Sequence, residues 1–298
     1  MIIVNKEFIA VPMNFSGGEI QADTKALMTI LDDEYNGNTD DILITANIKN
    51  SDDIFALLQI KEAIDNLLLS RPKINVHLKM PYLPYARYDR RMHLMDSFSL
   101  KVFTNILNSA KFDSVTIDDC HSDVGISLID KVIHREQKDL FSDFYHRKMF
   151  KFDGKHVRFE KIDAIIAPDM GAVKKAGKIA DELKVPLIVA NKVRDLSTGK
   201  ILKYEILNAT NIPDNVFIVD DICDGGATFL FLAEELKNLN KNVHISLYVT
   251  HGIFSKGLDV ILDKIDKVYA YHLWSDAGDH SKLNQSKYTD RYFWMNYF

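Results

Sequence analysis

The chain has 298 residues, of which 47% are hydrophobic and 27% charged, a balance that excludes a disordered or fibrous protein. Lysine and arginine together number 37 and aspartate and glutamate 42, so the formal net charge of -5 argues against non-specific nucleic-acid binding. At roughly 150 residues per domain, this length predicts two domains.

The cysteine content and the N-terminus indicate where the protein resides. Cys120 and Cys223 are far apart in the sequence and form no CxxC motif, so neither a disulfide framework nor a thiolate zinc site is expected. No apolar run approaches the ~18 residues of a membrane span, and Lys6 and Glu7 interrupt the apolar core that a signal peptide needs. We therefore expect a cytoplasmic protein without a membrane partner.

In the first half of the chain, short apolar runs alternate with helical periodicity. The segments 41–47, 76–82 and 114–118 are predicted to be strands. A helix is expected to start at Ser51 as its N-cap, and another after Asp96 or Ser97 as its N-cap.

The second half repeats this alternation. Strands are predicted at 162–167, 186–190, 216–220, 243–250 and 268–271, and helices at 171–183, 226–239 and 258–265. Such alternation predicts an α/β fold with mainly parallel sheets whose faces are covered by helices. Because it occurs twice, we expect two similar domains, 1–148 and 149–298. The tail from about residue 275 has two alternatives. It packs on the N-terminal domain or on a partner, or it is a frayed end.

The strongest signal for a site is the segment 216–228, where a buried strand ends in two acids and a further acid and two glycines precede a helix. Glycines let backbone N–H groups converge on an anion, and a helix N-terminus adds a favourable dipole. The acids would repel a phosphate unless they bind sugar hydroxyls or a magnesium ion. The segment therefore favours a ribose phosphate, and its alternative is an ordinary strand-to-helix turn with a capping aspartate.

This segment resembles the phosphoribosyl-diphosphate loop of the phosphoribosyltransferase fold. With it, seven segments between about residues 15 and 255 resemble, in order, motifs of the ribose-phosphate pyrophosphokinases. The other six segments are 15–19 (FSGGE), 84–91 (PYARYDRR), 118–121 (DDCH), 168–173 (PDMGAV), 191–194 (NKVR) and 250–255 (THGIFS). Simple phosphoribosyltransferases lack the N-terminal motifs.

The resemblance implies two phosphoribosyltransferase-type domains and magnesium-dependent transfer of the β,γ-diphosphate of ATP to the anomeric hydroxyl of ribose 5-phosphate, leaving AMP. It also implies small-molecule substrates and a homodimer or larger homo-oligomer. The implied ATP-binding residues are Phe15, Glu19, Arg87, Tyr88, Asp89 and Arg90. The implied catalytic residues are Lys192, Arg194 and His121, and the implied metal contacts are His121 and Asp169. The implied ribose-phosphate residues are Asp220, Asp221, Asp224, Gly225, Gly226, Ala227 and Thr228.

The sequence departs from the family pattern in its phosphate loop. Gly225 stands where the family has threonine, and Ala227 stands where it has glycine. A ribose with a bulkier 5-substituent, such as ADP-ribose, is therefore an alternative acceptor. Near the expected base site, Gly17 replaces an acid and Tyr88 a glutamine, and the segment after Arg194 lacks the arginine- and proline-rich loop of the family.

Other interpretations remain open for these residues and for the chain as a whole. A non-catalytic regulatory homologue and a phosphoribosyltransferase are the alternative functions. The arginines of 87–91 also fit a solvated charged face, and Lys192 and Arg194 a solvated strand edge. His121 also fits a surface histidine, and the other histidines, His134 among them, show no metal-ligand spacing and are interpreted as structural or surface residues.

Overall fold

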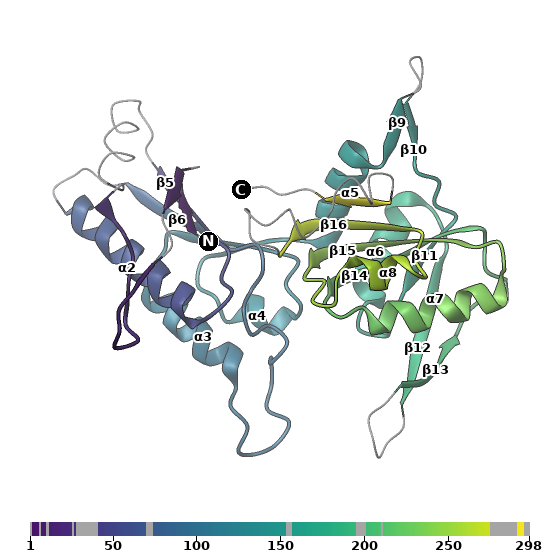
Figure 1. The fold of residues 1–298 in the computed structure, drawn as a ribbon, viewed down its shortest axis with the longest axis horizontal. Helices are drawn as coiled ribbons and strands as arrows, with labels where there is room; N and C mark the ends of the chain where they lie inside the picture. The colour runs from purple at the N-terminus through teal and green to yellow at the C-terminus, as the bar shows by residue number, and fades with distance from the viewer. Residues whose placement is uncertain are drawn as a thin grey trace. The chain divides into compact units, whose positions relative to one another are not determined.

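The structure is a computed structural model that describes residues 2–5, 7–9, 12–25, 27, 41–69, 74–152, 157–194, 201–209, 211–274 and 291–294. The chain divides into two compact units, Met1–Glu136 and Gln137–Tyr297 (Figure 1). Each unit has a hydrophobic core of its own. Within the described ranges, no helix is both long enough and apolar enough to span a membrane.

The first unit contains a six-stranded sheet. Its strands lie in the order β2 (Glu7–Ile9), β1 (Ile2–Val4), β5 (Asp41–Ala46), β6 (Asn75–Lys79), β7 (Ser114–Asp118) and β8 (Val132–Arg135). The four strands β5 to β8 are parallel, whereas β1 is antiparallel to both of its neighbours. Its helices are α2 (Ser51–Leu68), α3 (Ser99–Ser109) and α4 (Asp123–Ser127), and β3 (Met13–Asn14) and β4 (Ile20–Gln21) form a small hairpin.

The two predicted helix caps in this unit were wrong. Helix α2 is capped one residue earlier than expected, by Asn50, whose side chain accepts the N–H of Asp53 at 2.9 Å. Helix α3 has no side-chain cap. The Asp96 carboxylate instead accepts the N–H groups of Met92 and His93 at 3.1 and 2.7 Å, so it closes a turn in the preceding loop.

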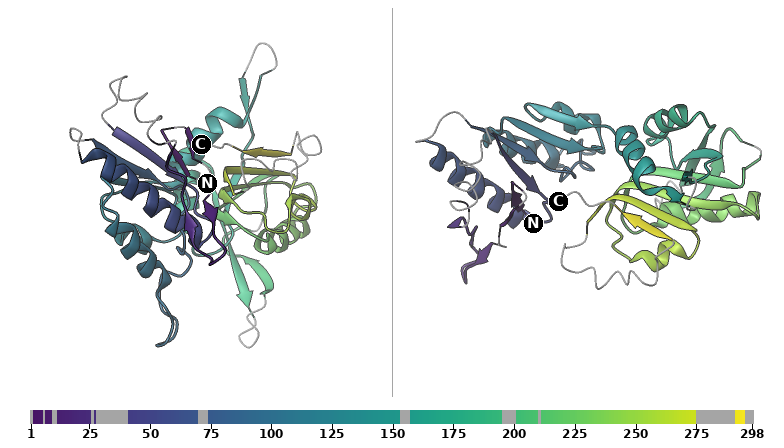
Figure 2. Two further views of the ribbon diagram at one scale, coloured as in Figure 1. Left: turned by 60° about the vertical axis from the view of Figure 1, so that its left-hand side comes forward. Right: turned by 90° about the horizontal axis from the view of Figure 1, so that it is seen from above.

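The second unit contains a seven-stranded sheet. Its strands lie in the order β13 (Ile201–Ile206), β12 (Leu187–Arg194), β11 (Ala164–Ala167), β14 (Asn215–Cys223), β15 (His244–Gly252), β16 (Lys267–Leu273) and β17 (Tyr292–Trp294). Only the pair β12–β13 is antiparallel in this sheet as described. Its helices are α5 (Gln137–Lys148), α6 (Val173–Leu183), α7 (Ala227–Leu239) and α8 (Leu258–Leu262), and β9 (Phe150–Phe152) pairs with β10 (Val157–Phe159). Figure 2 shows the two sheets from further directions.

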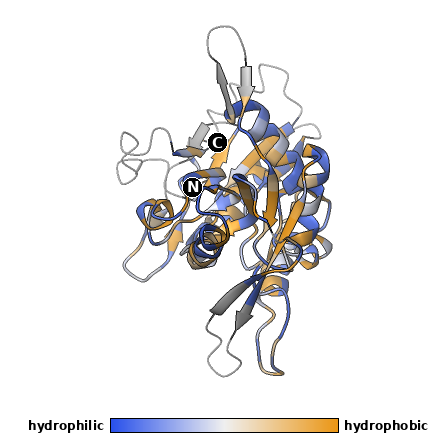
Figure 3. Cartoon of the chain, turned by 90° about the vertical axis from the view of Figure 1, so that its right-hand side faces the viewer, coloured by the Kyte–Doolittle hydropathy of each residue, from blue (hydrophilic) through white to orange (hydrophobic). Residues whose placement is uncertain are grey.

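The hydropathy of the elements explains the layers. In Figure 3 the strands are coloured mainly as hydrophobic, and the helices around them carry both hydrophilic and hydrophobic residues. The strand β11 is buried along its whole length, as expected for a parallel strand covered on both faces. Both units are therefore α/β with mainly parallel sheets flanked by helices, which confirms the predicted fold class.

The strand order of the second sheet creates one topological switch point. Strand β11 pairs with β12 on one side and with β14 on the other, so successive connections leave β11 in opposite directions. In open parallel sheets, ligands bind beyond the carboxyl ends of the strands at such a point. The segments that follow β11 and β14 therefore lie where a ligand is expected to bind.

Helix α5 belongs to the second unit, so the chain divides before this helix rather than after residue 148. The reason is aromatic packing, because Phe141 and Phe144 are buried and their rings lie 4.9 and 5.8 Å from that of Tyr248 on β15. For the C-terminal tail, β17 pairs with β16 in this same sheet. Residues 275–290 lie outside the described part of the chain.

Candidate active site

Two acids, Asp220 and Asp221, lie near the carboxyl end of β14. The strand was expected to end at these acids, but it continues to Cys223 because β15 pairs with it up to Gly252. On the other side, β11 pairs with it only up to Ile218. Asp220 and Asp221 therefore lie on a stretch of β14 that β11 no longer pairs with.

Two lysines accompany the carboxylates at this switch point. Lys192 Nζ on β12 lies 2.6 Å from Asp169 Oδ2, and Lys175 Nζ on α6 lies 3.5 Å from Asp221 Oδ2. Asp220 is half-buried. This burial, together with the negative charges of Asp221 and Asp169, raises the pKa of Asp220 well above its usual range. The site thus holds two lysine–carboxylate pairs around one carboxyl group that resists ionisation.

Lys175 was not predicted as a site residue. It lies in the first turn of α6, a few residues after the Asp169 loop, so its position beyond a strand end was the only signal in the sequence. Its pairing with an acid on a different element depends on the tertiary structure.

The loop after β11 fixes the Asp169 side chain through both of its oxygens. Asp169 Oδ1 accepts the N–H of Ala172 at 3.1 Å, and Oδ2 accepts a hydrogen bond from Lys192. A Cβ at Gly171 would come within 3.2 Å of Asp169 Oδ1, so the small residue suits this close turn. A metal ion would therefore contact Asp169 through water or in place of Lys192.

The predicted phosphate loop leads directly into α7. Gly226 has φ of 77° and precedes the helix, and a Cβ added there would lie 1.8 Å from Ile261 Cδ1. Only glycine fits this position without strain. No side chain caps α7, so its first N–H groups are oriented for an anion.

Lys256 adds a positive charge beside this loop. A Cβ at Gly225 would lie 3.4 Å from Lys256 Cε, so the lysine stem runs along the open side of the loop. Lys256 directly follows the segment 250–255 and was not predicted as a site residue. Together, the N-terminus of α7 and Lys256 form an environment suited to a phosphate group.

In the first unit, two of the predicted segments meet. Arg90 donates two hydrogen bonds to Asp89, at 2.7 and 2.9 Å, and these lower the pKa of Asp89 to about 2. A hydrogen bond from Ser122 and the charge of His121 act in the same direction. The loop 84–91 and the turn after β7 therefore adjoin, as expected if both contact one ligand.

The remaining ATP-binding candidates are exposed on the surface of the first unit. Arg87 is exposed, and Tyr88 exposes 65% of its surface. Phe15 exposes 54% and lies with Glu19 at the tip of the β3–β4 hairpin, where Phe15 N–H donates to Glu19 O at 2.9 Å. These side chains are accessible to a ligand, and their roles stay predictions.

Two predicted features lie outside the described side chains. Arg194 is the last residue of β12, but its side chain is not among those described, and residues 195–200 are not described at all. The described residues contain no group of three or more histidine, cysteine, aspartate or glutamate side chains arranged to hold a metal ion. The metal assignment to His121 and Asp169 stays a prediction.

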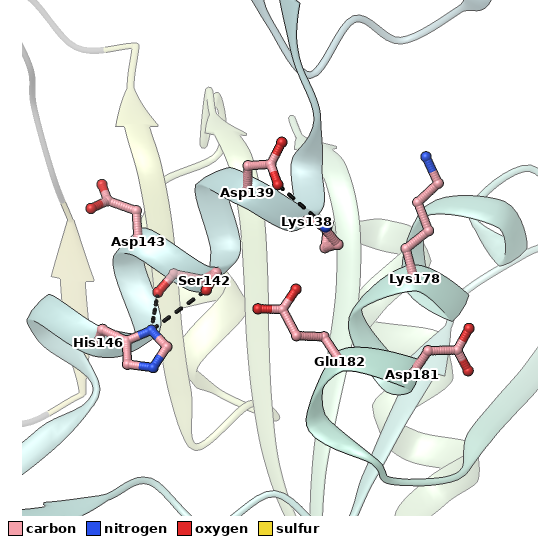
Figure 4. Close-up of a pocket in the computed structure, with 8 residues that line it drawn as sticks. All are labelled: Lys138, Asp139, Ser142, Asp143, His146, Lys178, Asp181 and Glu182. Carbon is pink, nitrogen blue, oxygen red and sulfur yellow. Dashed lines mark hydrogen bonds and ion pairs between the residues drawn. The ribbon is translucent and has the colours of Figure 1, made fainter.

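A polar groove lies between α5 and α6 (Figure 4). Lys138 pairs with Asp139 at 3.5 Å, and the ring of His146 interacts with Ser142 of the preceding turn. Glu182 extends from α6 toward α5 (Figure 4). The mixture of charges is typical of a solvated helix surface, so this groove adds nothing to the site.

The class of protein is defined by comparison with known families. A phosphoribosyl transferase domain matches residues 146–264, the region that contains the switch point and the loop before α7. The phosphoribosylpyrophosphate synthetase of Mycobacterium smegmatis has a similar fold, with a TM-score of 0.65 over 89% of this chain and 80% of that one at 18% identity. The chain therefore has the phosphoribosyltransferase fold.

Sequence relatives narrow this class. The ribose-phosphate pyrophosphokinase of Cereibacter sphaeroides is 29% identical over 214 residues, 71% of this chain and 59% of the relative. Ribose-phosphate pyrophosphokinase 1 of Streptococcus pneumoniae serotype 4 is 25% identical over 289 residues, 88% of this chain and 83% of the relative. The sequence is thus similar to that of ribose-phosphate pyrophosphokinases over most of its length. It spans less than two thirds of the length of several relatives, for example 59% for C. sphaeroides and 63% for Mycoplasma genitalium.

Proposed function

We propose that this protein transfers the β,γ-diphosphate of ATP to the anomeric hydroxyl of ribose 5-phosphate, producing phosphoribosyl diphosphate and AMP. The observation that carries the proposal is the set of charged groups at the switch point of the second sheet. Asp220 and Asp221 on β14 lie next to the loop before α7. Asp221 pairs with Lys175, and the charge of Asp169, which pairs with Lys192, also acts on Asp220.

Each group in this set suits a part of the substrates. The first N–H groups of α7 and Lys256 suit the 5-phosphate, and the carboxylates suit the ribose hydroxyls. Phosphoryl-type transfer depends on positioning and on neutralising negative charge. Lys192 would supply such a charge to the transferred group, with Arg194 on the same strand. In the first unit, Arg87 and Arg90 would bind the nucleotide through their permanently charged guanidinium groups.

Magnesium fits the donor set as an ion carried largely by the substrate. Carboxylate oxygens are the protein ligands that Mg²⁺ prefers, and the ion usually retains several waters and binds through one or two carboxylates plus substrate phosphates. The Asp169 carboxylate has a hydrogen-bond partner on each oxygen, which suits a contact made through such a water. We propose His121 in the first unit and Asp169 in the second as metal contacts, and a bound ion would neutralise phosphate charge.

Product analysis tests this proposal. The protein is incubated with ATP, Mg²⁺ and ribose 5-phosphate, and AMP and phosphoribosyl diphosphate are quantified. Stoichiometric formation of both is expected, and chelation of Mg²⁺ should abolish it. If no AMP is released with any of the ribose acceptors, the enzymatic assignment is overturned and a regulatory homologue is favoured. Consumption of phosphoribosyl diphosphate with a nitrogenous base, without ATP, would favour a phosphoribosyltransferase.

A ribose with a larger 5-substituent, such as ADP-ribose, is a second candidate acceptor. Two observations favour it: the side-chain hydroxyl of the family threonine is missing at Gly225, and a groove between α7 and α8 begins at Ala227. Phe231 lines this groove and exposes 51% of its surface, and Glu234 and Asp259 lie along it. An aromatic base and its ribose would find both an apolar surface and hydrogen-bond acceptors there.

Competition between the acceptors separates the two candidates. AMP release is measured with ribose 5-phosphate and with ADP-ribose in the wild type and in Phe231→Ala. If the groove binds the substituent, Phe231→Ala should lower kcat/KM for ADP-ribose about tenfold and leave ribose 5-phosphate unaffected. Equal changes for both acceptors would exclude a role of the groove in acceptor binding.

A further inference from the structure

The turn that carries His121 follows β7 at the carboxyl edge of the first sheet. His121 itself is exposed, whereas the three residues before it, Asp118 to Cys120, are buried. An exposed side chain can have a fixed position only if the backbone that carries it is held. The contacts on either side of His121 show what holds it.

The first contact is an ion pair beneath the turn. Both carboxylate oxygens of Asp118, which is fully buried, accept hydrogen bonds from the guanidinium group of Arg135 on β8. Burial lowers the pKa of the neighbouring Lys79 on β6, and the Asp118 charge opposes this effect. A paired arginine fork defines the direction of the carboxylate that it binds.

The next contacts hold the backbone. Asp119 has φ of 44°, in the left-handed region that a residue with a side chain seldom adopts, and its N–H donates to Arg135 O at 2.8 Å. The following N–H, that of Cys120, donates to Nε2 of His134 at 3.2 Å. The His134 side chain of β8 thus accepts a hydrogen bond from the turn at the point where backbone pairing between β7 and β8 ends.

The other side of the turn is held by α4. Cys120 Sγ lies 3.2 Å from Ser122 O, and Ser122 Oγ accepts the N–H of Val124 as the N-cap of α4. A Cβ at Gly125 would lie 2.7 Å from Cys120 Sγ, so helix and turn are in close contact. The residues immediately before and after His121 are therefore both fixed.

We propose that His134 and Arg135 are positioning residues, which hold the His121 turn in the orientation that the phosphates of the nucleotide require. The inference rests on the proposed function, because it assigns a purpose to the orientation of His121. It also gives His134 a defined structural role, since its ring accepts a hydrogen bond from the Cys120 N–H, which would otherwise lack this acceptor.

Substitutions at His134 test the inference. His134→Leu removes the acceptor, whereas His134→Gln offers Oε1 in its place. Lys131→Met, just before β8, is the matched control. Lys131 is exposed, its ammonium group lies 3.4 Å from Asp113, and it lies at the opposite end of β8 from the turn. We expect His134→Leu to lower kcat and raise KM for the magnesium nucleotide, each about tenfold, and His134→Gln to recover most of both losses. Arg135→Lys, which keeps the charge but loses the paired fork, should act in the same direction as His134→Leu.

A double-mutant cycle distinguishes positioning from general stability. In a His121→Ala background, His134→Leu should have no further effect on kcat, because there is no side chain left to position. An equal loss in both backgrounds would overturn the inference, since it would show that His134 acts independently of His121.

Amide hydrogen exchange supplies a readout that needs no turnover. The Cys120 amide should exchange at least about tenfold faster in His134→Leu than in the wild type, and at the wild-type rate in His134→Gln and Lys131→Met. Unchanged exchange in His134→Leu would overturn the inference. If the wild type releases no AMP but the variants show this exchange pattern, the proposed function is refuted, whereas the role of His134 in holding the His121 turn is supported.

Discussion

At the scale of single residues, the site is defined by the charges of its carboxylates and lysines. Three carboxylates, of Asp169, Asp220 and Asp221, lie close enough to influence one another, and two of them have a lysine within 3.5 Å. No ion pair joins Asp220 to a cation within the described residues. The ionisation of Asp220 is therefore costly in the folded protein.

This cost predicts how stability depends on pH. The unfolded Asp220 carboxyl ionises near pH 3.9, whereas the folded one keeps its proton to higher pH. Between these two pKa values the folded state binds more protons, so the contribution of Asp220 to the free energy of unfolding falls as the pH rises. Asp220→Asn removes this contribution while its amide oxygen can still accept the Asp221 N–H, which now donates to Asp220 Oδ1 at 2.9 Å.

Thermal unfolding without Mg²⁺ measures the effect. The gain in Tm of Asp220→Asn over the wild type should be larger at pH 8 than at pH 4.5. A gain that does not depend on pH would show that the carboxyl has an ordinary pKa. Asp163→Asn at the opposite end of the sheet is the comparison variant. Hydrogen bonds from Asn215 lower the pKa of Asp163, so the change in Tm on substitution should become less favourable as the pH rises.

Removal of the Lys192 charge should slow the reaction itself. Lys192→Ala is expected to lower kcat about 10²- to 10³-fold, because a cation next to the transferred group stabilises charge that develops in the transition state. The measurement is the rate of AMP release at saturating substrates. Lys161→Ala is the control: this lysine also pairs with an acid, Asp163, but its side chain is 73% exposed and lies before β11. Unchanged turnover in Lys192→Ala would remove this residue from the catalytic set.

At the scale of elements, the loop into α7 shows which of two adjacent glycines is required by the backbone. Gly226 combines a positive φ with a position against Ile261, which is buried. Gly225 has neither constraint, since the nearest atom to an added Cβ belongs to the flexible stem of Lys256. The backbone therefore does not require glycine at position 225.

Alanine at the two positions should differ accordingly. Gly226→Ala is expected to reduce the free energy of unfolding by about 1–3 kcal/mol through strain and overpacking. Gly225→Ala should change it by less than about 0.5 kcal/mol. Chemical denaturation of both variants provides the comparison, and equal stabilities would contradict the backbone requirement at Gly226.

At the scale of the whole molecule, the position of α5 determines where the second unit begins. Phe144 is fully buried, and its ring also lies 5.9 Å from that of Tyr269 on β16. Gln137 at the start of α5 donates to Asp220 O at 2.8 Å, so the helix also contacts the strand that carries the site. The helix is part of this core.

Two fragments test this boundary. A fragment of residues 137–298 should unfold cooperatively, as followed by circular dichroism. A fragment of residues 149–298 lacks α5 and should not, because losing a buried phenylalanine costs about 3–5 kcal/mol and two are lost. Equal cooperativity in both fragments would place the boundary at residue 148.

The sequence by itself determined the fold class and most of the parallel strands with the helices between them, and it supplied most of the candidate site residues. Periodicity and strand–helix alternation are local properties, and motifs such as 216–228 consist of neighbouring residues. The sequence did not predict α5, β8 or β13, and it misplaced the caps of α2 and α3. The length of β14 depended on its pairing with β15.

Only the tertiary structure decided which residues act together. The pair Lys175–Asp221, the position of Lys256 beside Gly225 and the hydrogen bond from Cys120 to His134 join residues on different elements. The same is true of α5, whose aromatic residues find their partners about a hundred residues later. These contacts follow from strand order and register, which bring distant residues together at the carboxyl edge of a sheet, and no local pattern in the sequence encodes that order.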